Sequence, residues 1–121
     1  MTDDADQQPD VFIVLDANDV DRIAEFWAEA LRYRRVDRLE QYVVLVPFEG
    51  NAGSVFLVQG VGDGKQTKNR MHLDLHVADP EVEATRLAAL GATRLGDGSL
   101  ADIRWIRMAD PEGNEFDIGQ R

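Results

Sequence analysis

The sequence contains no cysteine, and this absence excludes several kinds of site at once. Disulfide frameworks, thiolate metal sites, cysteine-ligated iron–sulfur clusters and cysteine nucleophiles all require a side chain that the protein lacks. Positive charge is also scarce, because 13 Lys and Arg stand against 23 Asp and Glu, which gives a formal net charge of -10. So acidic a surface repels phosphate backbones and anionic lipids, and we expect neither a nucleic-acid partner nor a membrane partner.

Long hydrophobic runs are missing as well. No segment approaches the roughly 18 consecutive apolar residues that a membrane-spanning helix needs. The first ten residues, MTDDADQQPD, have neither the basic start nor the apolar stretch of a secretory signal. We therefore expect a cytoplasmic protein. Residues 1–9 are acidic and rich in amides, and we expect them to form a disordered tail.

The residues that are present suffice for one folded domain. A chain of 121 residues that is 44% hydrophobic and 30% charged has the size and composition of a single globular domain with its own core. We predict that this domain covers residues 10–121.

The pattern of apolar residues predicts nearly the same order of elements twice. In the first half we predict strands over 11–16, 41–48 and 54–59, a helix over 20–33 and a further edge strand over 34–39. In the second half we predict strands over 71–77, 93–95, 103–108 and 116–118, a helix over 81–90, and turns over 96–98 and 110–113.

A shift of about 60 residues brings the ends of the two halves into register. Six matching pairs support it: Leu15 with Leu75, Asp19 with Asp79, Ala24 with Ala84, Gly53 with Gly113, Phe56 with Phe116, and Val58 with Ile118. Such a repeat indicates a duplicated βαβββ module. The predicted fold class is α+β, with two modules pairing into a curved, half-open barrel around a central pocket. Module one covers residues 10–60, a linker covers 61–69, and module two covers 70–121.

Two segments of the second half, KNRMHLDLHVADPE and RMADPEGNEFDI, are similar to motifs of the glyoxalase/bleomycin-resistance/dioxygenase superfamily, also called the vicinal-oxygen-chelate fold. The resemblance covers roughly residues 11–119. It implies four equivalent strand positions from which metal-using members take ligands, typically a His from the first strand of a module and a carboxylate from the last. In this sequence these positions are Phe12, Leu57, His72 and Asp117. The resemblance also implies a homodimer.

Only module two keeps metal-ligating side chains at these positions. His72 and Asp117 are two ligands, whereas a catalytic divalent ion normally takes three protein ligands and keeps open positions. Gln59 or Asp74 could supply a third oxygen. We expect no tight metal site and no cofactor, and if a metal does bind, we expect His72 and Asp117 to hold it.

The alternation in the strand from residue 71 places His72, Asp74 and His76 on the face opposite the predicted helix. Trp105 and Arg107 share one face of a later strand, which is either a pocket wall or a dimer contact. The candidate ligand-binding residues are Phe12, Leu57, Gln59, His72, Asp74, Trp105, Arg107 and Asp117.

These residues favour a small-molecule binding protein that takes a mostly apolar metabolite or drug without a tight catalytic metal. The alternative is a lyase, isomerase or dioxygenase in which His72 and Asp117 are catalytic, since a His–carboxylate pair can transfer protons at neutral pH. A third possibility is a subunit that serves only for interaction, with its pocket filled by its own side chains.

Overall fold

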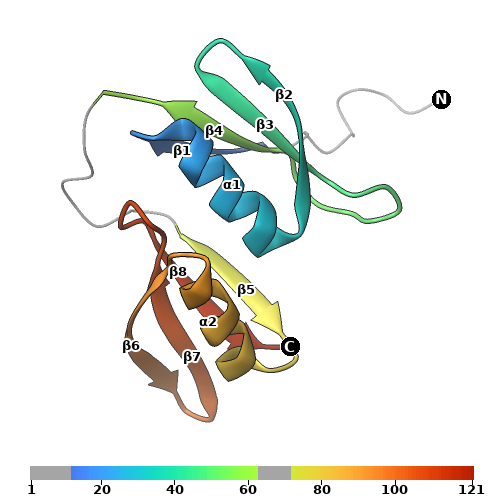
Figure 1. Ribbon diagram of the computed structural model, residues 1–121. Helices are drawn as coiled ribbons and strands as arrows, with labels where there is room; N and C mark the ends of the chain where they lie inside the picture. The colour runs from blue at the N-terminus through green and yellow to red at the C-terminus, as the bar shows by residue number, and fades with distance from the viewer. Residues whose placement is uncertain (1–11, 63–71) are drawn as a thin grey trace, which may run out of the picture.

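The computed structural model describes residues 12–62 and 72–121. The predicted tail over 1–9 and most of the predicted linker lie outside these residues. The elements are β1 (Ile13–Ala17), α1 (Val20–Leu31), β2 (Tyr33–Leu39), β3 (Tyr42–Pro47), β4 (Phe56–Gly60), β5 (Leu73–Val77), α2 (Pro80–Ala89), β6 (Thr93–Leu100), β7 (Ile103–Ala109) and β8 (Glu115–Gln120). A strand, a helix and three strands therefore follow one another twice (Figure 1).

Each module forms a four-stranded sheet of the same topology. The strand orders are β1-β4-β3-β2 and β5-β8-β7-β6, with the first and last strands of each module parallel and the other pairs antiparallel. The registers also repeat, because Ile13 lies opposite Phe56 and Leu73 lies opposite Phe116. The predicted α+β class with two βαβββ modules is confirmed, and the described sheets form no closed barrel.

Local sequence signals define both helices. Asp19 caps α1 by accepting a hydrogen bond from the backbone N–H of Arg22, and α1 ends where Arg32 adopts a left-handed conformation. Asp79 caps α2 in the same way, and Pro80 takes the first helical position, where no N–H is needed. In both modules a carboxylate and the apolar spacing behind it fix where the helix begins.

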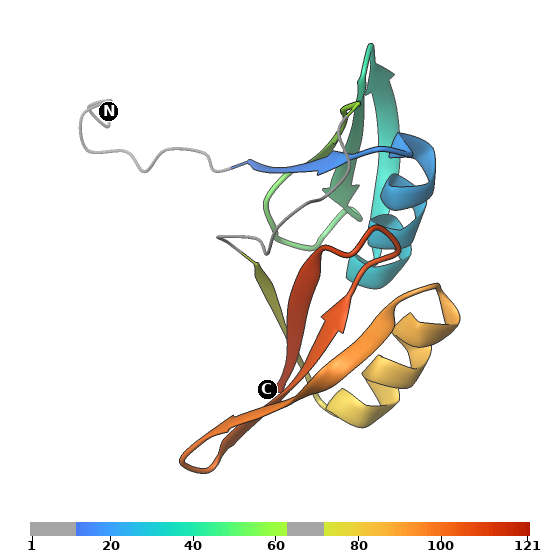
Figure 2. The same cartoon turned by 90° about the vertical axis from the view of Figure 1, so that its left-hand side faces the viewer.

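Helix α1 belongs to the core of both modules. Trp27 is 2% exposed and stacks on Phe56 of module one, with 5.7 Å between ring centroids. The same indole meets Phe116 of module two edge-on at 5.1 Å. Both helices lie on one side of the two sheets (Figure 2), and no helix or strand within residues 12–62 and 72–121 covers the other sheet faces.

A tight turn between β7 and β8 also joins the modules. Asp110 is buried and accepts a hydrogen bond from the indole N–H of Trp27 at 3.0 Å. The carboxylate of Glu112 accepts hydrogen bonds from the backbone N–H groups of Asn18 and Asp19, each at 2.7 Å. Because these N–H groups lie just before α1, a turn of module two helps to hold the start of the module-one helix.

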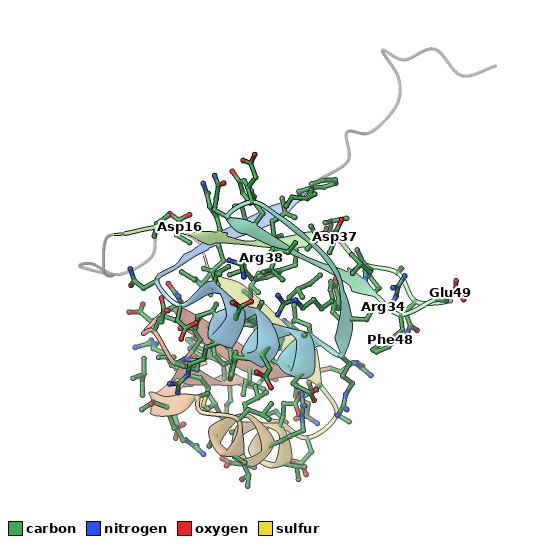
Figure 3. The ribbon with its side chains drawn as sticks, turned by 45° about the horizontal axis from the view of Figure 1, so that its top comes forward. Asp16, Arg34, Asp37, Arg38, Phe48 and Glu49 are labelled. Atoms are coloured by element: carbon green, nitrogen blue, oxygen red, sulfur yellow. The ribbon has the colours of Figure 1, made fainter. Side chains whose placement is uncertain are left out.

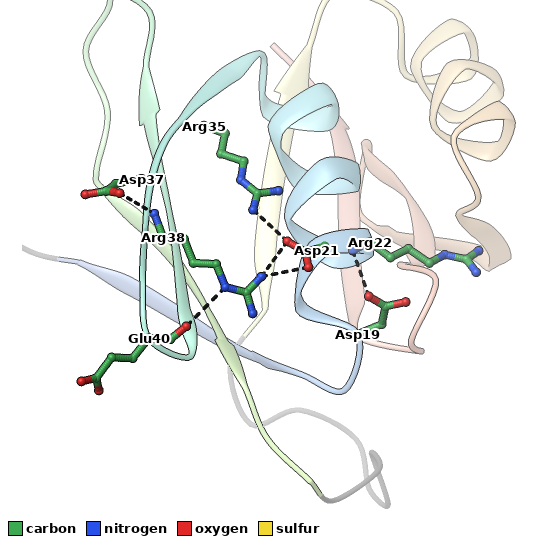
Figure 4. Close-up of polar contacts among 7 residues, drawn as sticks. All are labelled: Asp19, Asp21, Arg22, Arg35, Asp37, Arg38 and Glu40. Atoms are coloured by element: carbon green, nitrogen blue, oxygen red, sulfur yellow. Dashed lines mark hydrogen bonds and ion pairs between the residues drawn. The ribbon is translucent and has the colours of Figure 1, made fainter.

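Exposed ion pairs hold β2 against the first turn of α1. The carboxylate of Asp21 accepts hydrogen bonds from Arg35 at 2.7 Å and from Arg38 at 2.8 and 2.9 Å (Figure 4). These bonds lower the pKa of Asp21 below its ordinary value. Both arginines come from β2, so this strand is tied to the helix that it follows in the chain.

The prediction of a turn over 96–98 is wrong. Strand β6 continues to Leu100, and the hairpin turns at Ala101 and Asp102. The sequence Gly-Asp-Gly is typical of a turn, but here the register shifts between Arg94 and Gly96 and pairing then continues. Gly98 lies opposite Trp105, and the indole occupies the space that a side chain would need.

No helix among the described residues is long and apolar enough to cross a membrane.

Candidate functional site

The site is built on two neighbouring parallel strands of module two. In β5, Leu73, Leu75 and Val77 pack against the core. Alternation sends the side chains of His72, Asp74 and His76 to the opposite, open face. Strand β8 pairs with β5 so that Asp117 lies directly opposite Asp74. The pleat and the register therefore bring one imidazole and two carboxylates together.

His72 lies between the two carboxylates. Its Nε2 is 3.1 Å from Oδ1 of Asp74 and 3.3 Å from Oδ2 of Asp117. The side chains of His72 and Asp74 are about half exposed, whereas that of Asp117 is 20% exposed. An Nε2 that carries the imidazole hydrogen can donate it to either of these carboxylate oxygens. In the neutral imidazole, Nδ1 is then the atom with the free lone pair.

A cavity of about 1090 Å³ opens beside this cluster, and its described walls all come from module two. Strand β5 contributes His72, Asp74 and His76, and β8 contributes Asp117 and Gly119. The remaining wall includes Gly98 of β6 with Ile103 and Trp105 of β7. The hollow thus has an ionisable end at His72 and an aromatic and aliphatic side at Trp105 and Ile103.

The predicted site residues of module one lie elsewhere. Phe12 is 56% exposed just before β1, and Leu57 and Gln59 are half-buried on β4. Gln59 lies opposite Asp16, which Figure 3 labels. None of these three residues lines the module-two cavity. Arg107 lies opposite Asp117 in the sheet but is also outside the lining. A ligand-binding role for these four residues stays a prediction.

The family model of the glyoxalase-like domain matches residues 12–119. The chain belongs to the glyoxalase-like domain family. The match covers both modules, so the resemblance carried by the two second-half motifs extends over the whole described fold. A comparison with curated proteins found no significant match.

Solved structures share this glyoxalase-like fold at low sequence identity. A fosfomycin resistance protein, FosX, from Listeria monocytogenes matches with a TM-score of 0.74 and 18% identity, covering 95% of this chain and 94% of the other. A glyoxalase/bleomycin resistance protein/dioxygenase family enzyme from Burkholderia phytofirmans gives 0.73 and 14%, covering 90% and 95%. A glyoxalase-related enzyme from Fulvimarina pelagi gives 0.69 and 21%, covering 95% and 89%. These likenesses show the fold.

The four-position metal arrangement that the superfamily resemblance implies does not fit this glyoxalase-like domain. Phe12 and Leu57 occupy two of the four positions and have no lone pair to offer a cation. Among the described residues, His72, Asp74 and Asp117 do form a group whose ligand atoms all lie within 4.8 Å of one another. This triplet comes from one module only, and two of its members are half exposed.

Sequence reasoning gave too little weight to two features of this glyoxalase-like domain. The alternation placed His76 on the same face as His72 and Asp74, and there it lines the cavity, although we did not include it among the candidate ligand-binding residues. Gly98 was assigned to a turn, although it supports Trp105 from the neighbouring strand. The alternation in β5 was the signal for His76. No local pattern pairs Gly98 with Trp105, because that pairing depends on where the hairpin turns.

Proposed function

We propose that this protein binds a small molecule in the module-two cavity and does so without a tightly held catalytic metal. The observation that carries the proposal is the polar cluster of His72, Asp74 and Asp117 at one end of a cavity of about 1090 Å³. Ligand pockets commonly combine a roomy, largely apolar wall with a few converging polar groups that fix orientation. Trp105 and Ile103 supply apolar surface here, so the expected ligand is mostly apolar with one polar handle.

The absence of a tight metal is part of the proposal. Phe12 and Leu57 replace half of the ligand set that the resemblance implies, and Nε2 of His72 lies within 3.3 Å of a carboxylate oxygen of both Asp74 and Asp117. A His whose Nε2 hydrogen is shared between two carboxylates must lose that hydrogen before Nε2 can bind a cation. We therefore expect purified protein to hold less than stoichiometric metal.

The test combines a ligand screen with elemental analysis. Metal-stripped protein is screened by thermal shift against apolar metabolites and antibiotics, since a ligand that binds only the folded state raises the melting temperature. Hits are then measured by calorimetry with His72→Ala and Asp117→Ala, and we expect affinity to fall at least tenfold in each. Glu49→Gln, a change on an exposed residue of module one (Figure 3), is the control. A screen in which no compound raises the melting temperature would contradict the proposal. So would purified protein that holds one metal ion per chain and loses it in His72→Ala.

A second candidate function is proton-transfer catalysis by His72. The contacts of Nε2 with Asp74 and Asp117 favour it, because they orient the ring and leave Nδ1 free to accept a proton from a bound substrate. Such an enzyme would be a lyase or an isomerase. Turnover of a 2-oxoaldehyde hemithioacetal that is abolished by His72→Ala would support catalysis, and turnover that survives this change would exclude it.

We also propose a homodimer. The open sheet face of module one exposes Phe12 and Val14 by more than half, which is apolar surface that a second chain can cover. Sedimentation velocity measures the oligomeric state directly. We expect a dimer that Phe12→Asp converts to monomer, and a wild-type monomer at micromolar concentration would contradict this.

A further inference from the structure

We infer that the module-two cavity selects a flat aromatic ligand that carries positive charge and stacks on Trp105. The inference rests on the proposed function and names its ligand class. It depends on three observations: two glycines beside Trp105, a histidine across from it, and an excess of carboxylates in the lining.

A row of four residues crosses the sheet beneath the cavity. Gly98 lies opposite Trp105, Trp105 lies opposite Gly119, and Gly119 lies opposite His76. All four line the cavity. Trp105 therefore has a glycine on each side, and no side chain from its direct neighbours competes with the indole for space.

The indole rests directly on Gly98. A Cβ atom added to Gly98 would collide with Cε2, Nε1 and Cζ2 of Trp105. The backbone of β6 therefore supports the ring, and the half-buried indole also forms cavity wall. A flat platform held in place loses little side-chain freedom on binding, which favours stacking by a planar partner.

On the other side of Trp105, Gly119 leaves an open strip in front of His76. A Cβ atom added there would approach the His76 ring only to 3.8 Å, an ordinary van der Waals distance. The indole and the imidazole thus lie on either side of a position without a side chain. This strip gives a planar ring room to lie across Gly119 against Trp105.

The charge of the lining determines whether the cavity favours a positively or a negatively charged ligand. The lining contains six carboxylates, Asp74, Asp79, Glu81, Asp97, Asp102 and Asp117, against two arginines, Arg104 and Arg121. Arg94, just outside the lining, pairs with Glu81 and Asp97, which gives 3 − 6 = −3 with both histidines neutral. A cleft lined by charges of one sign concentrates ligands of the opposite charge. The face of a tryptophan also attracts cations. Together these effects favour a basic aromatic ligand over a neutral or acidic one.

The experiment uses three simple probes with the full chain and isothermal titration calorimetry. Proflavine is a flat aromatic cation, 9-anthracenecarboxylate is a flat anion, and spermidine is a cation without a ring. We expect proflavine to bind at least tenfold more tightly than either of the others. Equal affinity for proflavine and 9-anthracenecarboxylate would overturn the charge selection, and equal affinity for spermidine would overturn the stacking.

A matched pair of glycine variants tests the platform. Gly98→Ala pushes the indole off its support, whereas a Cβ atom at Gly96 of the same strand meets nothing within 4 Å. Neither glycine has a positive φ, so alanine suits both backbones. We expect Gly98→Ala to weaken proflavine binding at least tenfold and Gly96→Ala to change it less than twofold. Equal affinities in the two variants would overturn the inference.

A change at Trp105 itself gives a second, independent readout. Trp105→Ala should abolish proflavine binding and Trp105→Phe should retain part of it, with far-UV circular dichroism verifying the fold of each. Proflavine binding that survives Trp105→Ala would overturn the inference. If the library screen finds ligands that depend on His72 but not on Trp105, the inference fails while the proposed function stands. If no ligand is found at all, both fail.

Discussion

Asp110 is a small residue whose loss should lower the stability substantially. Its buried carboxylate accepts hydrogen bonds from the indole N–H of Trp27, the backbone N–H groups of Glu112 and Asn114, and the side-chain amide of Asn114. Asp110→Ala leaves these donors without a partner inside the protein. We expect the free energy of unfolding to fall by about 2–4 kcal/mol, measured by urea denaturation.

Two further variants separate the hydrogen bonds of Asp110 from general effects of substitution. Asp110→Asn keeps one acceptor oxygen and should lie between wild type and Asp110→Ala. Asp102→Ala removes a carboxylate from the exposed turn of the β6–β7 hairpin and should change stability by less than about 0.5 kcal/mol. A loss in Asp110→Ala no larger than that in Asp102→Ala would show that the buried bonds contribute nothing.

Single residues show clearly what local sequence can and cannot predict. The run Asp-Pro-Glu-Gly-Asn predicts a turn, and the structure has a turn there because Asp110 bonds to its own following N–H groups. The bond from Trp27 joins residues 83 apart, so only the fold brings them together. The site residues lie between these two cases. Alternation predicts which face of the sheet carries His72, Asp74 and Asp117, but the distances between them depend on the register of β5 with β8.

The two helices are joined by one arginine. Arg86 of α2 donates hydrogen bonds to the backbone carbonyls of Glu29 and Ala30, in the last turn of α1. Its guanidinium also pairs with Glu83, with 2.6 Å between Nε and Oε1. Glu83 therefore orients the side chain that connects α2 to α1.

This contact predicts a pH-dependent contribution to stability. The hydrogen bond from Arg86 lowers the pKa of Glu83 below its ordinary value of 4.5. A carboxyl group whose pKa is lowered by folding stabilises the protein above the unfolded value, and the contribution is lost as the pH falls through the folded value. We expect Glu83→Gln to be less stable than wild type at pH 7 by about 1 kcal/mol and equal to it once the pH is well below 4.5.

Urea titrations at a series of pH values measure this difference. Glu49→Gln, which removes an exposed charge outside this contact, corrects for the change in net charge. A difference between wild type and Glu83→Gln that stays constant from pH 7 to pH 3 would contradict the assigned ion pair.

Among the elements, the helices were predictable and one hairpin was not. Asp19 and Asp79 cap helices whose apolar spacing is clear, so their starts follow from sequence. In β6, Gly96 and Gly98 are typical of a turn, yet both residues pair with β7 as part of the strand. The indole of Trp105, on the neighbouring strand, occupies the space above Gly98, and the local sequence of β6 does not show this contact.

For the molecule as a whole, the duplication predicts the fold better than it predicts the site. The register of β1 with β4 repeats in that of β5 with β8, and each paired residue in module two lies 60 positions after its equivalent in module one. The same shift places Phe12 and Leu57 at the positions of His72 and Asp117, so the chemical asymmetry was visible in the sequence. The described cavity walls all come from module two, and the 60-residue shift, which treats the two modules alike, does not predict this.

The shared position of α1 predicts that the two modules unfold together. Trp27 contacts Phe56 of module one at 5.7 Å and Phe116 of module two at 5.1 Å, so neither module keeps a filled core without this helix. We expect one transition, with the same midpoint by tryptophan fluorescence and by far-UV circular dichroism. Phe56→Leu and Phe116→Leu should each lower the stability by about 1–2 kcal/mol and shift both signals equally. Separate midpoints, or a signal that moves in only one of the two variants, would mean that the modules unfold independently.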